Sequence, residues 1–150
     1  MITSHLVRVG SVGWEHPEWR GSFYPEDIPA DWLLSYYNTQ FQAVFLSADT
    51  WTGVSGADWA RWLYDTREDF VFVLEPAPGV EPPSSPRVMQ AAPAWAAGHL
   101  WWIDETPDLR ALAQHITAHA ASGEPLFVFS REGSLARLGQ AAELVRVMGY

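Results

Sequence analysis

The sequence predicts an α/β fold with a parallel sheet of about five strands built from βα repeats. Short apolar runs alternate with helical patterns along the 150 residues of the chain. A βαβ unit takes roughly 30 residues, so this length holds about five such units. Hydrophobic residues make up 48% of the chain, which is enough for a sizeable core. We therefore expect one domain over residues 1–150.

The first half of the chain supplies three of the expected strands and two of the helices. The strands are the apolar runs over residues 6–9, 43–46 and 70–74. Helices are predicted over residues 29–40 and 57–65, because aromatic and apolar side chains recur there at helical spacing.

The second half begins with a break in the pattern. Residues 76–86 are rich in Pro, Gly and Ser, which predicts a loop. Residues 88–97 follow with a weak helical pattern that Pro93 interrupts. The remaining elements are strands over 100–103 and 126–129 and helices over 107–121 and about 134–147.

The stretch between the first strand and the first helix, residues 10–25, is the most specific feature of the sequence. Gly10 and Gly13 let the backbone turn sharply as it leaves the strand. Four aromatic side chains follow in a loop with little periodicity, namely Trp14, Trp19, Phe23 and Tyr24. Aromatic side chains on such a loop either pack down as a plug or line a pocket.

This stretch resembles the opening of the domain-of-unknown-function family 72, whose members carry a Gly-Thr-Ser-Gly-Trp turn and a Trp-x-Gly-x-Phe-Tyr-Pro loop. Residues 19–25 match the loop in full, and residues 10–14 match the turn in part. The resemblance continues to Phe41, and residues 109–131 resemble the end of the same family. The family's biochemical role is not established, so the resemblance speaks to architecture more than to activity.

The architecture that the resemblance implies is a truncated TIM-barrel-like fold. A complete eight-stranded barrel needs on the order of 200 residues or more, so this chain is too short for one. It would keep the family's first three strands and its last two. The implied order is 4-5-1-2-3, all parallel, with the strands numbered along the chain.

The resemblance also implies that the family's polar strand-end site is lost. The family has a Val-Glu-Ile-Asn pattern on its second strand, where residues 44–47 read Val-Phe-Leu-Ser, so Phe45 stands in place of Glu. The third strand ends in Lys in the family and in Glu75 here. The final strand ends in Phe-Asn-Asn in the family, whereas residues 129–131 read Phe-Ser-Arg.

Candidate site residues lie where barrel enzymes place their chemistry, at the carboxyl ends of the strands. Together with the aromatic side chains near those ends, they form a candidate binding site of Ser11, Trp14, Trp19, Arg20, Tyr24, Ser47, Asp49, Trp51, Glu75, Asp104, Ser130 and Arg131. The chain has 9 Trp, and for these we favour packing over lining a cavity. No serine lies in a Gly-x-Ser-x-Gly elbow, so no catalytic residue is assigned.

Two further clusters of polar residues can be interpreted either as functional sites or as ordinary surface residues. Glu75, Asp104 and Glu105 could form a carboxylate cluster for acid–base work or a hard cation, but we favour a solvated strand end beside a helix N-terminus. His115 and His119 are four residues apart, a spacing that can hold a metal, but no Glu follows His115 as in zinc proteases. We expect both on the exposed side of their helix, and we expect no metal and no cofactor.

Charge and composition exclude several classes of function. The chain has 9 basic residues, all of them Arg, against 18 acidic ones, and a net charge of -9 argues against a nucleic-acid partner. The absence of Lys and Cys excludes Schiff-base chemistry, thiol nucleophiles and disulfides. No window is apolar enough for a membrane span, and residues 1–5 do not resemble a signal peptide. We therefore expect a cytoplasmic protein with no membrane partner.

Two functions stay open at this point. The first is a binding or self-association module that is not an enzyme of the parent type, with a small molecule as a further possible ligand. The alternative is a small-molecule hydrolase with an acidic and aromatic strand-end site.

Self-association follows from the missing strands. Opening the barrel would expose an apolar inner face, including Phe45 and Phe129, and two strand edges. The chain could curl into a tighter barrel, cover the face with residues 76–97, or pair with a second copy. The prolines of that segment disfavour its replacing the strands, so we predict a homodimer.

Overall fold

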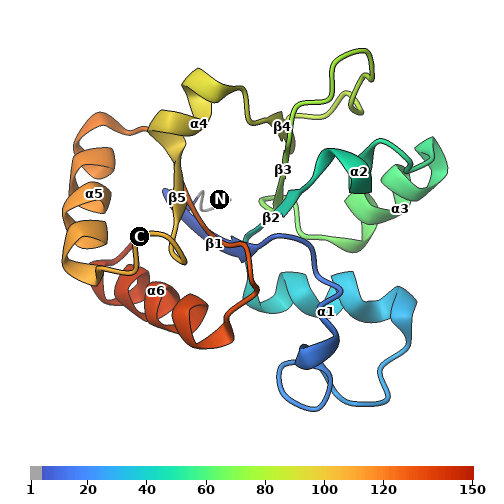
Figure 1. The fold of residues 1–150 in the computed structure, drawn as a ribbon, viewed down its shortest axis with the longest axis horizontal. Helices are drawn as coiled ribbons and strands as arrows, with labels where there is room; N and C mark the ends of the chain where they lie inside the picture. Colours follow the sequence, from blue (N-terminus) through green and yellow to red (C-terminus); the bar gives the residue numbers. More distant parts are fainter. Residues whose placement is uncertain (1–4) are drawn as a thin grey trace.

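Two three-stranded parallel sheets form the centre of the structure, a computed structural model that describes residues 5–150 (Figure 1). One sheet has the order β1-β6-β5 and consists of β1 (Val7–Ser11), β6 (Leu126–Ser130) and β5 (Leu100–Trp102). The other has the order β2-β3-β4 and consists of β2 (Ala43–Leu46), β3 (Val71–Leu74) and β4 (Val88–Gln90). The predicted α/β class with parallel strands from βα repeats is confirmed, and no closed barrel forms among the described residues. The predicted lack of a signal peptide concerns residues 1–5, of which residues 1–4 lie outside the described part.

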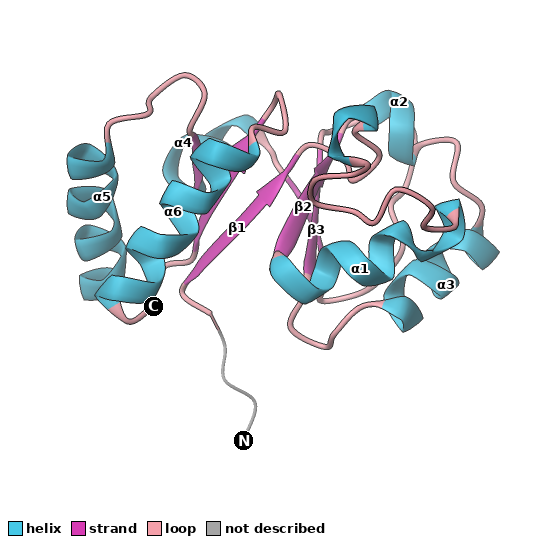
Figure 2. Ribbon diagram, turned by 90° about the horizontal axis from the view of Figure 1, so that it is seen from below, coloured by secondary structure: helices cyan, strands magenta, loops and turns pink. Residues whose placement is uncertain are grey.

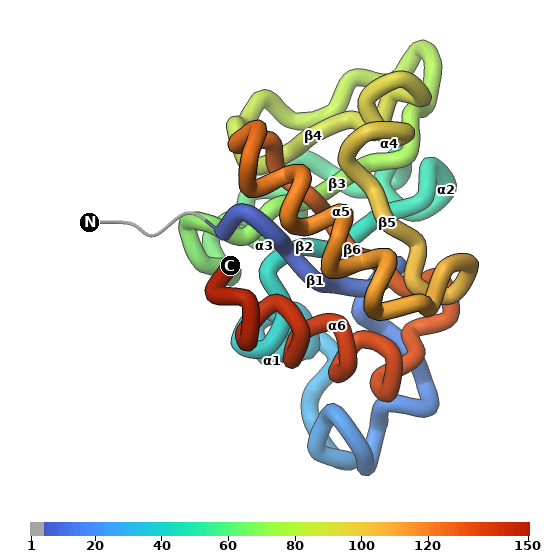
Figure 3. The backbone as a smooth tube through the Cα atoms, turned by 90° about the vertical axis from the view of Figure 1, so that its left-hand side faces the viewer, coloured from blue at the N-terminus to red at the C-terminus, as the bar shows by residue number. Residues whose placement is uncertain are grey.

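The helices cover the outer faces of the two sheets. In Figure 2, α5 and α6 lie on one side of β1, and α1, α2 and α3 lie on the other. Figure 3, turned to the side, shows α5 and α6 in front of the first sheet. The helical elements are η1 (Pro17–Trp19), η2 (Ala30–Trp32), α1 (Leu33–Gln40), α2 (Ala48–Trp51), α3 (Gly56–Asp65), α4 (Pro93–His99), α5 (Leu109–Ser122) and α6 (Leu135–Met148). None of the helices in the described part is long and apolar enough to span a bilayer.

The seam between β1 and β2 explains why the strands do not form one continuous ladder. The Tyr37 hydroxyl accepts a hydrogen bond from the Ser11 N–H and donates one to the Ala43 carbonyl, both at 2.8 Å. It therefore stands between two backbone groups that would otherwise pair. A direct bond resumes one step later, where the Gly13 N–H donates to the Phe45 carbonyl at 2.9 Å.

Glycine is required at this seam by the close approach of the two strands. A Cβ on Gly10 would lie 1.9 Å from the Ala43 carbonyl oxygen and 2.7 Å from the Tyr37 hydroxyl. The expected single sheet in the order 4-5-1-2-3 is thus not what the structure has. Three of the expected neighbouring pairs are present, namely β5–β6, β6–β1 and β2–β3. The fourth expected pair, β1–β2, is reduced to one bridge between Val12 and Phe45.

The predicted exposure of the inner face is wrong, because residues 88–102 cover that face. A third strand, β4, replaces the start of the expected weak helix, and α4 runs from β4 to β5 across the open side (Figure 1). Trp95 of α4, together with Met89 and Trp102, packs on the inner cluster of Ala43, Phe45, Val71, Val73, Ala91, Phe127 and Phe129. Phe45 is 7% exposed and Phe129 is 0% exposed. A single chain therefore covers the face that was expected to need a second copy.

Candidate functional site

The aromatic loop after β1 packs down as a plug at three of its predicted site residues. Trp19 is buried, and its indole nitrogen donates to the Gly133 carbonyl at 2.8 Å. The Tyr24 hydroxyl donates to the Trp14 carbonyl at 2.7 Å, and burial raises the pKa of Tyr24 so that the hydroxyl stays a donor. Arg20 donates to the carbonyls of Glu26 and Ile28 at 3.2 and 2.9 Å. These side chains fix the shape of the loop.

His16 is clamped inside the same loop. Its ring lies against Trp19 with centroids 4.4 Å apart, and its Nε2 donates to the Val12 carbonyl at 2.8 Å. Gly133, with φ of 66°, approaches the other side so closely that a Cβ there would lie 2.7 Å from the ring. The loop after β6 therefore braces the loop after β1.

A pocket of about 230 Å³ opens at the carboxyl ends of β1 and β2. We call it the strand-end pocket, and it is lined by Val12, Gly13, Trp14, Glu15, His16, Leu46, Thr50 and Trp62. Trp14 and Trp62 meet edge to face, with ring centroids 4.8 Å apart and ring planes at 86°. Of the predicted site residues, only Trp14 lines this pocket.

The other polar and aromatic residues of the strand-end pocket were not predicted from the sequence. Glu15 and His16 lie beside Trp14 in the aromatic loop, so their proximity to that loop was the available signal. Trp62 and Thr50 come from α3 and α2, and no spacing in the sequence links them to the loop.

Acidic side chains surround the far side of the Trp14–Trp62 pair. A second hollow of about 290 Å³ is lined there by Trp14, Glu15, Ala30, Asp31, Leu34, Asp58, Arg61, Trp62 and Asp65. Its one positive charge is engaged, because Arg61 lies 3.2 Å from the Asp31 carboxylate and 3.5 Å from that of Asp65. The surroundings of the pair are therefore net negative.

Asp104, Ser130 and Arg131 form a bonded network at the ends of β5 and β6. Asp104 accepts from the Ser130 hydroxyl at 2.8 Å, from the Glu132 N–H at 3.1 Å and from the Arg131 N–H. The Ser130 hydroxyl oxygen in turn accepts from the Ser134 N–H at 3.0 Å. The Arg131 guanidinium lies 3.7 Å above the Trp102 ring and pairs with Glu105 at 3.2 Å. The network holds the turn into α6.

Four of the five remaining predicted residues form hydrogen bonds to the chain around them. Glu75 accepts from the Ala48 N–H at 2.8 Å, so its carboxylate sits on the first turn of α2. Trp51 is buried and donates to the Glu75 carbonyl at 2.8 Å. The hydroxyls of Ser47 and Thr50 are 2.9 Å apart, and the Ser11 hydroxyl donates to the Gly13 carbonyl at 2.5 Å. Asp49, also in α2, is exposed.

The two acidic candidates do not come together. Glu75 follows β3 and Asp104 follows β5, which belong to different sheets. Within residues 5–150, no three side chains of His, Asp or Glu are placed to hold a metal ion. The expectation that both histidines of α5 are exposed is wrong for His119, which is buried and donates from Nδ1 to the Glu124 carbonyl at 2.8 Å. Burial, and secondarily His119, lowers the pKa of His115.

Comparisons with known proteins place the aromatic loop in a family context. The family model described as "Protein of unknown function DUF72" matches residues 8–77. No curated protein matches the chain. The crystal structure of a DUF72 family protein from Thermotoga maritima is similar at 20% sequence identity and a TM-score of 0.42, over 97% of this chain and 54% of that one. This chain thus spans about half the length of that protein. It resembles the DUF72 family most specifically over residues 8–77, the stretch that runs from β1 to the end of β3.

Proposed function

We propose that this chain is a small-molecule binding module whose site is the strand-end pocket. The observation that carries the proposal is the pocket itself, because it joins two Trp rings and the exposed Glu15 carboxylate at the carboxyl ends of two parallel strands. That edge is where barrel-type folds bind their ligands. The pocket is smaller than a typical drug-sized site, so it suits a compact ligand.

Binding is favoured over catalysis by what the polar side chains already do. A nucleophile needs a base within hydrogen-bond reach, and neither Ser11 nor Ser130 has a histidine as its bonded partner. The carboxylates of Glu75 and Asp104 accept hydrogen bonds from backbone N–H groups and so stabilise the fold. The alternative of a hydrolase would gain support from turnover that is lost in Asp104→Asn or Glu75→Gln.

The ligand class we propose is a compact aromatic or aliphatic amine. The faces of Trp rings attract cations, and the exposed Glu15 carboxylate at the rim can pair with an ammonium group. The hollow behind the Trp pair adds further negative charge, with its only Arg already bound to Asp31 and Asp65. An anionic ligand would meet repulsion from the same groups.

The test compares three probes of one shape that differ in charge: benzylamine, benzyl alcohol and benzoate. Calorimetric titration at low ionic strength is expected to rank their affinities in that order. Glu15→Gln is expected to weaken benzylamine by about two- to fivefold and to leave benzyl alcohol unchanged, as for an exposed ion pair. Glu26→Gln is the matched control, since Glu26 is an exposed carboxylate of the same loop outside the pocket. Equal affinity for benzylamine and benzoate would refute the proposal.

A further inference from the structure

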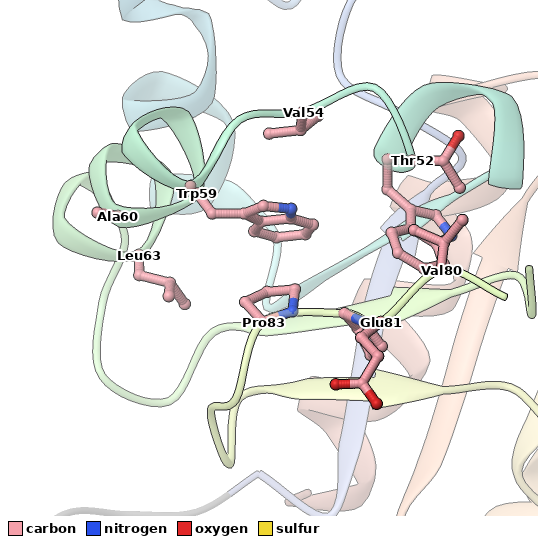
Figure 4. A pocket seen from close by; sticks show the side chains of 11 residues that line it. Thr52, Val54, Trp59, Ala60, Leu63, Val80, Glu81 and Pro83 are labelled. Carbon is pink, nitrogen blue, oxygen red and sulfur yellow. The ribbon is translucent and has the colours of Figure 1, made fainter.

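A second pocket shares no lining residue with the strand-end pocket, although its Trp59 ring lies 5.1 Å from that of Trp62, measured between centroids. It is a hollow of about 390 Å³ between α2, α3 and the proline-rich loop of residues 76–86 (Figure 4). We call it the outer pocket. We propose that it binds a small, uncharged and mostly apolar molecule that carries a hydrogen-bond acceptor for the indole N–H of Trp59.

The walls of the outer pocket are mostly apolar. Trp59 lies between Val54 on one side and Pro83 on the other, with Val80 and Thr52 across the opening (Figure 4). Pro82 and Pro83 contribute no backbone N–H, and the Thr52 hydroxyl already donates to the Ala48 carbonyl at 2.7 Å. A ligand in this pocket therefore finds apolar surface and few free donors.

Trp59 supplies the polar contact that a ligand could use. The side chain is 5% exposed, yet no atom within residues 5–150 accepts a hydrogen bond from its indole nitrogen. The indole nitrogens of Trp19, Trp51 and Trp101 donate to backbone carbonyls, whereas that of Trp14, which is 7% exposed, is like that of Trp59 in having no acceptor within residues 5–150. Within the same residues no fully buried side-chain nitrogen lacks a partner, so the Trp59 nitrogen is not sealed from water, and Trp59 lines the outer pocket. An N–H donor without a partner in the protein, beside a pocket, is a place where a ligand's acceptor can bind.

Both ends of the loop that forms the outer pocket are anchored. At the start, the Trp51 indole donates to the Glu75 carbonyl at 2.8 Å. At the end, Arg87 donates to the carbonyls of Phe70 and Leu63, both at 2.9 Å. A preformed site loses little ordering entropy on binding, so even a compact molecule can bind measurably.

The charge of the ligand follows from the one ionisable side chain in the lining. Glu81 is exposed on the loop and would repel an anion. A cation could pair with Glu81 only outside the apolar walls, where water screens the contact. An uncharged molecule with a carbonyl or ether oxygen therefore fits best.

The test uses two probes of the same shape. Acetophenone carries a carbonyl oxygen where α-methylstyrene carries a methylidene group, so the pair isolates one acceptor. Titration of the full chain, followed through the indole N–H signals in nitrogen-15 NMR spectra, is expected to give acetophenone about three- to tenfold tighter binding. The Trp59 signal should move with acetophenone. Equal affinities, or no binding of either probe, would overturn the proposal.

Variants test whether the difference in affinity between the two probes comes from the Trp59 N–H. Trp59→Phe keeps an aromatic wall and removes the N–H, so the two probes should then bind equally. Trp32→Phe is the matched control, because Trp32 is 62% exposed and lines none of the three pockets described here. If Trp59→Phe does not fold, the comparison of the two probes on the unaltered protein still decides the matter.

The proposals for the outer pocket and for the strand-end pocket can be tested separately. Saturating benzylamine is expected to leave the acetophenone affinity unchanged, because the two pockets share no lining residue. Displacement of acetophenone by benzylamine would place both probes in one site and would overturn the assignment to the outer pocket.

Discussion

Phe45 illustrates at the scale of a single residue what fills the inner cluster of this fold. It occupies the position at which the resemblance to the family implies Glu. Its ring lies 5.2 Å from that of Trp102 and 5.8 Å from that of Phe129, measured between centroids. A charge at this position would have no polar partner among the side chains of the inner cluster, which are all apolar. The inner face is therefore a core and not a site.

The first prediction restores the family's residue. Phe45→Glu is expected to lower the free energy of unfolding by about 4 kcal/mol, because an unpaired carboxylate would be buried. Phe45→Leu keeps the site apolar and is expected to cost about 1 kcal/mol. Urea unfolding followed by circular dichroism measures both. Similar losses for the two variants would contradict the buried, apolar environment.

Tyr37 is the residue that separates the two sheets. Burial raises the pKa of Tyr37, so at neutral pH its hydroxyl is protonated and can both donate and accept. Tyr37→Phe is expected to cost about 2 kcal/mol in urea unfolding, because the Ser11 N–H and the Ala43 carbonyl lose their partner. Tyr36→Phe, in the same helix, is the control and should change the stability little. A neutral effect of Tyr37→Phe would mean that the strands close the gap directly.

At the scale of elements, α4 covers the inner cluster that the strands leave open. It leads from the edge strand β4 to the edge strand β5 and places Trp95 on the inner cluster. The Trp95 ring lies 5.7 Å from that of Phe127, measured between centroids. One short helix and one large side chain thus keep water from the inner face.

The matching prediction removes that side chain. Trp95→Ala is expected to cost about 3 kcal/mol and to raise the fluorescence of a dye that binds exposed apolar surface. Trp32→Ala should stay within about 0.5 kcal/mol of the parent, because Trp32 is 62% exposed. Dye binding that is equal in the two variants would show that α4 does not seal the face.

The sequence predicted the elements better than their assembly. Strands and helices with strong periodicity, such as α5 and β6, lie where the patterns placed them. The sequence predicts a weak helical pattern over residues 88–97 that Pro93 interrupts, and it misses β4, which is only three residues long and pairs with β3 through its backbone. Such pairing is non-local and leaves no periodic signal. The strand-end pocket was found only through Trp14, since its other wall comes from α2 and α3.

At the scale of the whole molecule, the chain itself covers the inner cluster between its strands and α4. The inner face that motivated a homodimer is buried in a single copy, so homodimerisation stays a prediction that this face no longer supports. Any interface between copies would have to use the outer surface, where Trp32, Tyr64 and Val147 are exposed.

Because the chain covers its own inner cluster, we expect its stability not to depend on a partner. We expect the urea midpoint to be the same from about 1 to about 100 µM protein, because only a fold that depends on association gains stability with concentration. Light scattering in the same range would report whether copies associate at all, against a monomer mass of 16.8 kDa. A midpoint that rises with concentration would show that the fold depends on association between copies.

The most direct test of the proposed function is a crystal structure of the protein soaked with benzylamine. We expect the benzylamine ring to lie against Trp14 and Trp62 in the strand-end pocket, with its ammonium group beside the Glu15 carboxylate. Glu15→Gln crystals should hold the probe less fully under the same conditions, and Glu26→Gln crystals should hold it equally. An empty strand-end pocket at saturating benzylamine, or benzoate bound there in its place, would contradict the account.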